Sequence, residues 1–476
     1  MTYPEAIQFL FGLRWFGARF GLENTLKLAA LAGDPHRQLR FIHVAGTNGK
    51  GSSCAMLESI YRAAGLRVGL FTSPHLVSFG ERIQVNRQPI PEPEIARLAS
   101  WMRSLLEQGW HGIAGGQIAR SARETEPIGP VPPGGTRSAP EDHPTFFEVV
   151  TVMALRYFAE QKCDLVIWET GLGGRLDATN IVTPLASVIT NIQYDHQQWL
   201  GQTLASIAAE KAGVIKPGVP ILTAAEIPEA LHVIEETAQQ RNAPLTVVRP
   251  AETQRSPLST IELPLLGRHQ RLNAALAIAA VRALAPRIPV SEDAIRAGLS
   301  SMHWAGRLQL VTRPSGQKIL LDGAHNVAGA DILAAALREY FPTARHTLVL
   351  GILRDKDWIR MCDILAPLAA RIQLVPVPSE RSATPQELSA ACGRANPKAQ
   401  ILEHSTLAQA LSDCLQDSFV TIAGSLYLIG EAMELLQLSP INSHSERGLN
   451  EWLGKPQSSN LKPQGSSKIQ APTSAS

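Results

Sequence analysis

The stretch Phe41-Ile42-His43-Val44-Ala45-Gly46-Thr47-Asn48-Gly49-Lys50-Gly51-Ser52 decides the fold, because an apolar run breaks there into a glycine-rich loop with one lysine. Residues 53–64, which follow, have helical character. A strand, a glycine loop and a helix in this order place backbone N–H groups around a phosphate. Lys50 would then reach the β- and γ-phosphates, and a nearby hydroxyl could meet Mg²⁺. The residues expected to bind the nucleotide here are Gly46, Thr47, Asn48, Gly49, Lys50, Gly51 and Ser52.

The loop has a simpler alternative interpretation, and it departs from the common phosphate-loop pattern at two positions. Asn48-Gly49 alone is a frequent turn signal, so the alternative is a strand-ending turn with a solvated lysine. The common pattern places a glycine where this chain has Val44, and Gly51 here separates Lys50 from Ser52. This tighter loop resembles that of the Mur ligase superfamily. Within it, residues 46–52 resemble the bifunctional folylpolyglutamate synthase and dihydrofolate synthase branch.

Length and composition predict a cytoplasmic enzyme of two domains. The chain has 476 residues, 45% of them apolar and 18% charged, which is ordinary for a globular enzyme. A net charge of +2 gives no basic surface for nucleic acid. No apolar stretch is long enough to span a membrane, and the N-terminus lacks the order of a signal peptide. Five scattered cysteines predict free thiols in a reducing compartment, and no heptad stripe demands assembly, so we expect a monomer.

Short runs rich in Val and Ile alternate with helical patterns, which predicts an α/β fold. We expect a P-loop-type, mostly parallel sheet with helices on both faces over residues 1–300, and a smaller Rossmann-like α/β domain over 301–438. The boundary is predicted between 299 and 304. Residues 109–144, dense in Gly, Pro and Ser, predict a flexible insertion, and the polar tail 439–476 predicts disorder. Predicted strands are 41–45, 67–71, 164–168, 186–191, 219–222, 318–321, 347–350, 372–375 and 419–422; predicted helices are 146–160, 203–212, 273–285, 291–299, 328–340, 357–369, 385–393 and 426–437.

Polar residues follow several predicted strands, where ligands bind in open α/β sheets. Ser73 follows the second strand, Glu169 ends the third, and Asp195-His196 lies after the fourth, with Lys211 on the next helix. One serine and one glutamate, completed by phosphate oxygens, form a sensible Mg²⁺ site. Each residue alone has a plainer interpretation: a surface carboxylate, a hydrogen-bonded loop pair or a solvated helix lysine.

The order of these motifs carries the resemblance. Thr-Ser-Pro at 72–74, Glu-x-Gly-x-Gly-Gly-x-Leu-Asp-x-Thr-Asn at 169–180, Asp-His at 195–196 and Glu-Lys-Ala-Gly at 210–213 occur in the family's order. The resemblance implies ATP and two Mg²⁺ ions, one bound by Ser73 and Glu169 and the second by His196. It also implies that Lys211 is carbamylated. A lysine takes CO₂ only as the neutral amine, so its pKa must be lowered.

The C-terminal half contains further motifs of the same branch. Residues 321–326, Leu-Asp-Gly-Ala-His-Asn, could be a generic turn and helix cap. The resemblance implies that Asp322 meets the ribose, that His325 lies near the phosphates and that Arg307 supplies a cation to them. The segment around Arg307 has Ala305 where the family has proline. Asn273 matches the asparagine that contacts adenine. Residues 353–357 and 423–427 also resemble this branch, and the similarity covers residues 5–438.

The activity that the resemblance implies is an ATP-dependent ligase. ATP would phosphorylate a carboxylate to an acyl phosphate, which the amine of L-glutamate attacks, with Lys50, Lys211 and His325 as catalytic residues. The acceptors would be dihydropteroate and tetrahydrofolate. The family's pterin contacts map onto Thr145, Phe147 and Asp177. Phe147 suits stacking on a flat heterocycle, although core packing at a helix start is the alternative. Residues 16–23 are a further candidate, and closure near 299–304 is expected on binding.

Three rival functions are distinguishable. The first is a folylpolyglutamate synthase without dihydrofolate synthase activity. The second is a Mur ligase acting on a UDP-linked sugar, whose additional N-terminal domain has no room before a phosphate loop at residue 46. The third is a nucleotide-binding regulator that has lost catalysis, against which the intact lysines and metal-binding residues argue.

Overall fold

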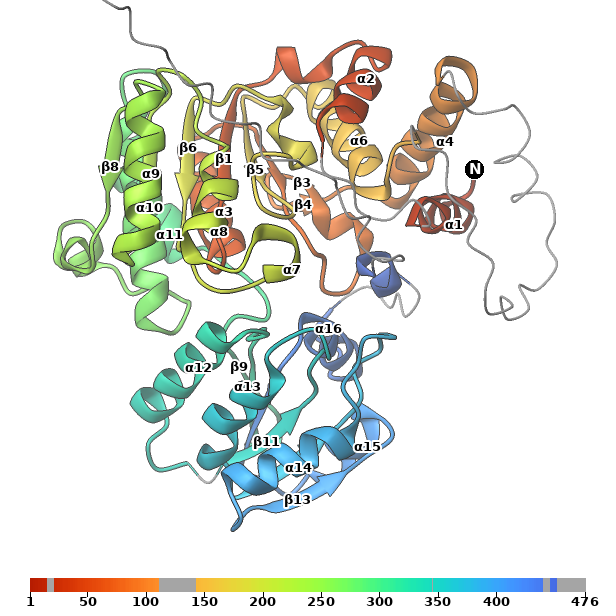
Figure 1. Cartoon of the computed structure of the whole chain (residues 1–476), viewed down its shortest axis with the longest axis vertical. Helices are drawn as coiled ribbons and strands as arrows, with labels where there is room; N and C mark the ends of the chain where they lie inside the picture. The colour runs from red at the N-terminus through yellow and green to blue at the C-terminus, as the bar shows by residue number, and fades with distance from the viewer. Residues whose placement is uncertain (15–20, 111–142, 345, 440–445, 452–476) are drawn as a thin grey trace, which may run out of the picture.

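The chain forms two α/β domains, one above the other in Figure 1. The structure, a computed structural model, describes residues 1–14, 21–110, 143–344, 346–439 and 446–451. The N-terminal domain runs from α1 (Tyr3–Leu13) to α11 (Glu292–Ser300), and the C-terminal domain begins with β9 (Gln309–Thr312). The predicted α/β class is therefore confirmed, with a separate sheet in each half of the chain.

The N-terminal sheet has eight strands in the order β4-β3-β2-β5-β1-β6-β7-β8. The strand that ends in the glycine loop, β1, pairs in parallel with β5 on one side and β6 on the other. All five of its residues are buried, as expected for a strand covered on both faces. The strands are β1 (Phe41–Ala45), β2 (Val68–Phe71), β3 (Ile83–Val85), β4 (Gln88–Pro89), β5 (Leu165–Glu169), β6 (Ala186–Ile189), β7 (Ile221–Thr223) and β8 (Leu245–Val247).

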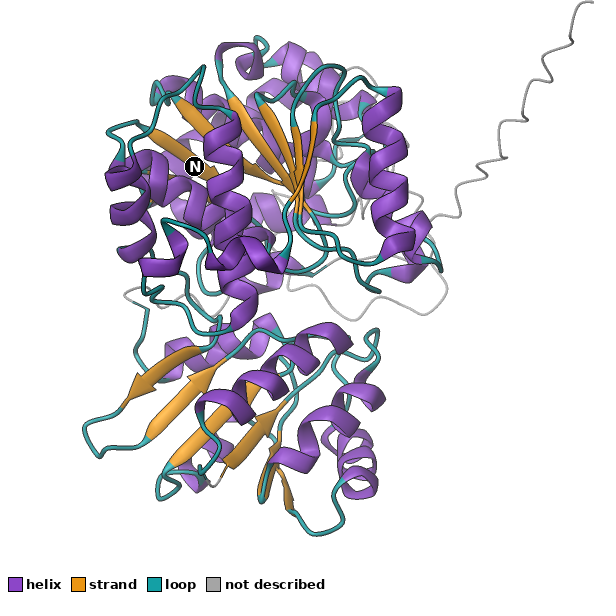
Figure 2. Cartoon of the chain, turned by 90° about the vertical axis from the view of Figure 1, so that its left-hand side faces the viewer, coloured by secondary structure: helices purple, strands orange, loops and turns teal. Residues whose placement is uncertain are grey.

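Helices cover both faces of this sheet (Figure 2). Alternate residues of β1 point to opposite faces, so Phe41 joins the core under α1, α2, α4 and α6, while Ile42 joins the core under α3, α10 and α11. The remaining helices of the domain are α2 (Glu23–Leu31), α3 (Lys50–Ala63), α4 (Glu92–Gly109), α6 (Phe146–Glu160), α7 (Gln197–Leu200), α8 (Leu204–Ala212), α9 (Pro228–Gln240) and α10 (Arg268–Ala283).

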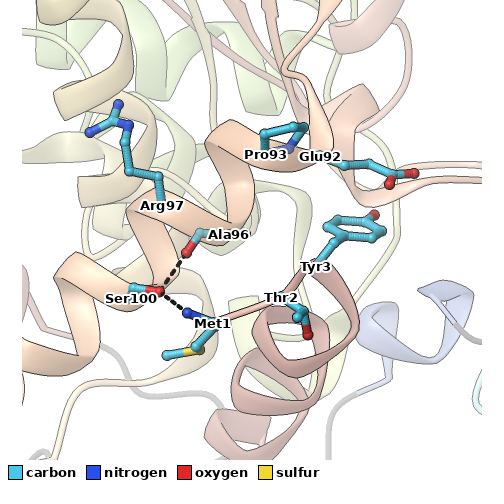
Figure 3. Close-up of a pocket in the computed structure, with 8 residues that line it drawn as sticks. All are labelled: Met1, Thr2, Tyr3, Glu92, Pro93, Ala96, Arg97 and Ser100. Atoms are coloured by element: carbon cyan, nitrogen blue, oxygen red, sulfur yellow. Dashed lines mark hydrogen bonds between the residues drawn. The ribbon is translucent and has the colours of Figure 1, made fainter.

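The first helix is fixed to α4 through the start of the chain. The Met1 ammonium donates to Ser100 Oγ at 2.8 Å, and Ser100 Oγ donates to Ala96 O at 2.8 Å (Figure 3). A surface hollow of about 570 Å³ lies here, lined by residues of α1 and α4. None of the predicted site residues lines it.

The C-terminal sheet has six strands in the order β13-β12-β11-β14-β10-β9, all parallel except the edge pair β9 and β10. Its strands after β9 are β10 (Lys318–Leu321), β11 (His346–Leu350), β12 (Arg371–Leu374), β13 (Gln400–Glu403) and β14 (Phe419–Ala423). Its helices are α12 (Val327–Tyr340), α13 (Trp358–Leu365), α14 (Pro385–Ala395), α15 (Leu407–Asp413) and α16 (Leu426–Leu435). The change from one sheet to the other falls between residues 300 and 309.

Five strands were not predicted, namely β3, β4, β8, β9 and β13. They are short or only half-buried, as in β8 and β9, so their apolar signal is weak. The predicted helix 357–369 ends earlier, at Leu365, and a 3₁₀ turn over Ala366–Leu368 follows it.

The tail prediction needs a correction. Residues Glu446–Asn450 form a 3₁₀ helix, η8, with three buried side chains, so the disorder predicted for the whole of 439–476 is wrong for this part. Its charged side chains Glu446 and Arg447 contact Tyr3 and Glu434 elsewhere in the chain. Residues 440–445 and 452–476 of the predicted tail lie outside the described residues, as do 111–142 of the predicted insertion and 16–20 of the predicted contact region 16–23.

The described helices include none that is both long and apolar enough to cross a membrane. All five cysteines are free and buried, which confirms the expected thiols.

Candidate active site

The glycine loop connects β1 to α3 and is held by β6 and α10. Thr47 N–H donates to Asn191 O at 2.8 Å, and Asn48 N–H donates to Asn191 Oδ1 at 2.8 Å. Gly49 has φ +86°, and a Cβ there would lie 2.6 Å from Asn273 Oδ1. The position therefore needs glycine both for its backbone and for close contact with α10. The helix α3 starts directly after it, so its free N–H groups face the loop.

Two lysines meet at this loop. Lys50 Nζ donates to Gly46 O at 3.2 Å and to Thr47 O at 3.3 Å. Lys211 Nζ, from α8, donates to the same Gly46 O at 2.8 Å. Burial and the charge of Lys50 lower the pKa of Lys211 to about 7, so a large fraction of this amine is neutral at physiological pH. The structure thus brings together two lysines that are far apart in sequence.

The predicted metal residues Ser73 and Glu169 lie at neighbouring strand ends. Ser73 N–H donates to Glu169 Oε2 at 3.1 Å. Burial raises the pKa of Glu169 to about 7, while Lys50, the hydrogen bond and Arg307 act in the opposite direction. A buried carboxylate beside a hydroxyl is a hard oxygen donor set, which fits Mg²⁺. Within the described ranges, no three His, Cys, Asp or Glu side chains group as a complete metal site, so phosphate oxygens and water would have to complete it.

Asp195 connects the two domains. Its Oδ1 lies 2.6 Å from Lys356 Nζ, and its Oδ2 accepts from Asn326 Nδ2 at 3.1 Å. Asn326 in turn exchanges amide hydrogen bonds with Asn48 of the glycine loop, at 3.1 and 3.3 Å. Burial raises the pKa of Asp195, but His325 and Lys356 outweigh it and hold that pKa well below its usual range.

The sequence prediction placed Asp195 beside His196 among the candidate ligand-site positions but gave it no contact between domains, and it assigned no role to Asn326 or Lys356. All three stand in motifs that carried the family resemblance, at 195–196, 321–326 and 353–357, and that was the available signal. Their mutual contacts could not be read from the chain.

The other predicted nucleotide residues surround the loop from both domains. Asn273 Nδ2 donates to Gln270 Oε1 at 3.1 Å beside Gly49. Asp322 accepts from Leu308 N–H and Ala324 N–H at 2.8 and 2.9 Å. Arg307 is half-buried, and the charges of Asp322 and Glu169 support its own, although partial burial lowers its pKa overall.

The two predicted histidines both lie near the Asp195 carboxylate. His325 Nε2 is 3.7 Å and His196 Nε2 3.9 Å from Asp195 Oδ2. His325 Nδ1 lies 2.7 Å from Gly323 O, and since a carbonyl only accepts, this nitrogen carries the proton. Burial and Lys356 lower the pKa of His196 to about 3, so its imidazole is neutral and able to bind a metal.

A cavity of about 240 Å³ lies between the domains and collects the remaining predicted residues. The predicted residues on its wall are Ser73, Thr145, Phe147, Asp177, His196 and His325. Thr145 caps α6 by accepting from Glu148 N–H at 3.3 Å. The Asp177 carboxylate accepts from Leu172 N–H at 2.7 Å and Thr179 N–H at 3.0 Å. Phe147 is half-buried, with its ring 6.0 Å from that of Phe71, so it joins the core at one edge and borders the cavity.

Comparison with known proteins identifies the family of the chain. Residues 306–426 match the family model described as Mur ligase, glutamate ligase domain. A dihydrofolate synthase/folylpolyglutamate synthase of Bacillus subtilis is 36% identical over 92% of this chain and 99% of that protein. The crystal structure of folylpolyglutamate synthase from Thermotoga maritima has a TM-score of 0.75 and 30% identity, over 94% of this chain and 98% of that one. Escherichia coli FolC, in complex with DHPP and ADP, has a TM-score of 0.75 and 31% identity, over 92% and 98%. Alignment of this extent at these identities shows that the chain belongs to the dihydrofolate synthase/folylpolyglutamate synthase family of ATP-binding ligases.

Proposed function

We propose that this protein adds L-glutamate both to dihydropteroate and to the γ-carboxylate of tetrahydrofolate, with an acyl phosphate as intermediate. One observation carries the proposal. A single cavity is lined by Ser73, His196 and His325, which are expected near the phosphates, and by Thr145, Phe147 and Asp177, which are expected to contact the acceptor. A pterin held at the second group would direct its carboxylate toward the first, where phosphoryl transfer is expected.

The nucleotide would be bound by residues of both domains. Lys50 and the N–H groups of α3 take the phosphates, with Arg307 opposite, while Asn273 contacts adenine and Asp322 the ribose. Ser73 and Glu169 would hold one Mg²⁺ and His196 a second. When bound, the ions neutralise charge on the γ-phosphoryl oxygens.

The second step needs a base, because the amino group of glutamate is protonated in solution. His325 is suited to this role, since its Nδ1–H donates to Gly323 O and its Nε2 remains to accept a proton. The Asp195 carboxylate beside Nε2 would stabilise the imidazolium that forms. The amine then attacks the acyl carbon, and phosphate leaves with the oxygen that bridged the two groups.

Carbamylation of Lys211 belongs to the same proposal. Burial and the charge of Lys50 lower the pKa of this amine to about 7, so a substantial fraction of it is neutral near neutral pH and able to react with CO₂. Protein incubated with ¹³C-bicarbonate should give a carbamate NMR signal that is lost in Lys211→Gln. Lys216→Gln, which changes a less buried lysine, should retain it.

The deciding assay is ADP release by the purified protein with Mg²⁺-ATP and L-glutamate, comparing 7,8-dihydropteroate, tetrahydrofolate and no acceptor. Release with both acceptors, and products heavier by one glutamyl residue, is the expected result. An acceptor labelled with ¹⁸O in its carboxylate should transfer one label to inorganic phosphate, because the acyl phosphate contains that oxygen.

Each other outcome identifies a rival. Release with tetrahydrofolate alone would leave only the folylpolyglutamate synthase. ATP binding with no acceptor-stimulated release would remove the ligase assignment and favour a regulator. Label remaining in the acceptor would exclude the acyl phosphate.

A further inference from the structure

The residues 446–451, which we call the C-terminal strap, return from the C-terminal domain to the N-terminal domain. In Figure 1 the strap is the short dark blue helix η8 beside the N-terminal domain. The chain reaches it after α16, which packs on the C-terminal sheet. The strap itself contacts α1 and the 3₁₀ turn Phe79–Arg82.

Three residues anchor the strap. Glu446 accepts from Tyr3 Oη at 2.7 Å and from Phe79 N–H at 2.7 Å. Arg447 forms a buried ion pair with Glu434 of α16. Leu449 is 1% exposed and belongs to the core of the N-terminal domain. Contacts of this kind bind a segment firmly, because releasing it would expose apolar surface and separate buried charges.

The other end of the strap, Asn450 and Glu451, lies on the wall of the interdomain cavity and contacts three arginines. Arg14 Nε donates to Glu451 O at 2.8 Å, and Arg82 Nη2 donates to Asn450 Oδ1. Arg381 Nε lies 3.3 Å from Glu451 Oε2. All three arginines line the same cavity as Asn450 and Glu451. They come from both domains and from distant parts of the chain, and the strap is where they meet.

Arg82 is held most closely. Its Nε donates to His75 Nδ1 at 2.8 Å, so that nitrogen carries no proton and His75 Nε2–H donates to Glu446 O at 3.0 Å. The strap therefore contacts Arg82 directly through Asn450 and indirectly through His75. Asn450 Nδ2 also donates to His75 O at 3.0 Å, which fixes the amide orientation that presents Oδ1 to the guanidinium.

We propose that the C-terminal strap is a positioning element of the active site, which orients Arg14 and Arg82 to bind a substrate carboxylate in the interdomain cavity. Arg381 and Glu451 join the strap to the C-terminal domain. The proposal rests on the proposed function, since both the acceptor and L-glutamate bring carboxylates to this cavity. The carboxylate is recognised by guanidinium groups, whichever of the two substrates supplies it.

The test uses the full-length enzyme and the ADP-release assay. Asn450→Ala removes one charge-assisted hydrogen bond, so we expect the KM for the acceptor or for L-glutamate to rise roughly fivefold to tenfold. The KM for ATP and kcat should stay within twofold, because the strap packs on α1 and the turn Phe79–Arg82, and the hydrogen bonds described for it go to neither the glycine loop nor α3. Measuring both KM values shows which substrate supplies the carboxylate. Glu403→Gln, an exposed carboxyl change on β13, is the matched control.

A double variant separates positioning from simple stability. If Asn450 acts through Arg82, Arg82→Ala with Asn450→Ala should bind no more weakly than Arg82→Ala alone. Additive losses would overturn the proposal, as would unchanged KM values in Asn450→Ala. Equal rises in every KM, with a lowered melting temperature, would also overturn it by showing a purely structural role. A wild-type enzyme that is inactive with both acceptors would refute the proposed function as well, which distinguishes the two failures.

Discussion

The ion pair between Asp195 and Lys356 offers the sharpest test of how the two domains are held together. Its N–O distance is 2.6 Å, and the side chains are only 8% and 9% exposed. At this distance and an effective dielectric constant of about 20, the gross attraction is about 6 kcal/mol. Removing one partner leaves a buried charge, which costs about 3–5 kcal/mol in comparable pairs.

The change to make is Lys356→Met, and the structure favours the lower end of that range. Asp195 keeps its contacts with Asn326 Nδ2 at 3.1 Å and with its neighbouring His196 N–H at 2.8 Å. We therefore expect a loss of about 3 kcal/mol in the docking of the domains, which is roughly a 100-fold change in that equilibrium. kcat/KM in the ADP-release assay should fall by up to the same factor, and hydrogen exchange should rise in the loops around residues 195 and 356.

The loss of stability caused by Lys356→Met should depend on pH, in the direction set by the lowered pKa of Asp195. The pKa of Asp195 is held well below its unfolded value, so the stabilisation is present above about pH 4 and is lost as pH falls through the lowered pKa. The difference between wild type and Lys356→Met should thus be largest at neutral pH and shrink below about pH 4.

The matched control is Arg354→Met in the same loop. Its pair with Glu387 has a similar distance, 2.9 Å, but is 54% and 39% exposed, so the expected effect is below about 1 kcal/mol. Equal effects of the two changes, or none from Lys356→Met, would refute the reasoning that burial makes the interdomain pair strong.

Three further predictions concern the glycine loop and its neighbours. Gly49→Ala should raise the KM for ATP at least tenfold, because its Cβ would meet Asn273. Gly65 has nearly the same φ, +87°, but open space around it, so Gly65→Ala should lower only the melting temperature, by the equivalent of about 1 kcal/mol. Glu169→Gln should raise the Mg²⁺ concentration for half-maximal ADP release at least tenfold, while the exposed Glu236→Gln should leave it unchanged. Lys211→Met should stabilise the ligand-free protein. Burial lowers the pKa of the Lys211 ammonium to about 7, so the destabilisation of the folded protein by this buried charge is fully present below pH 7. The increase in the free energy of unfolding, at most about 5 kcal/mol, should shrink as pH rises from 7 toward 10.5. An increase that stays constant with pH in chemical denaturation would contradict a lowered pKa for Lys211.

The sequence alone determined the local elements that carry strong patterns. An apolar run followed by glycines defined β1 and the start of α3, and the helical pattern over 146–160 defined α6. These signals act over a few residues, so they survive without knowledge of the fold. The family resemblance extended them to the residues around the nucleotide.

The interdomain contacts were decided only by the tertiary structure. Asp195 and Lys356 are 161 residues apart, and nothing near either position shows that the other neutralises it. The strap shows the same limit more clearly. Its polar composition predicted disorder, yet Glu446 and Arg447 are buried, because Tyr3, Phe79 and Glu434 supply their hydrogen bonds and opposite charge. The composition of a segment shows that burying its charges would be costly. It does not show which residues offset that cost, because those residues come from distant segments that meet only in the folded protein.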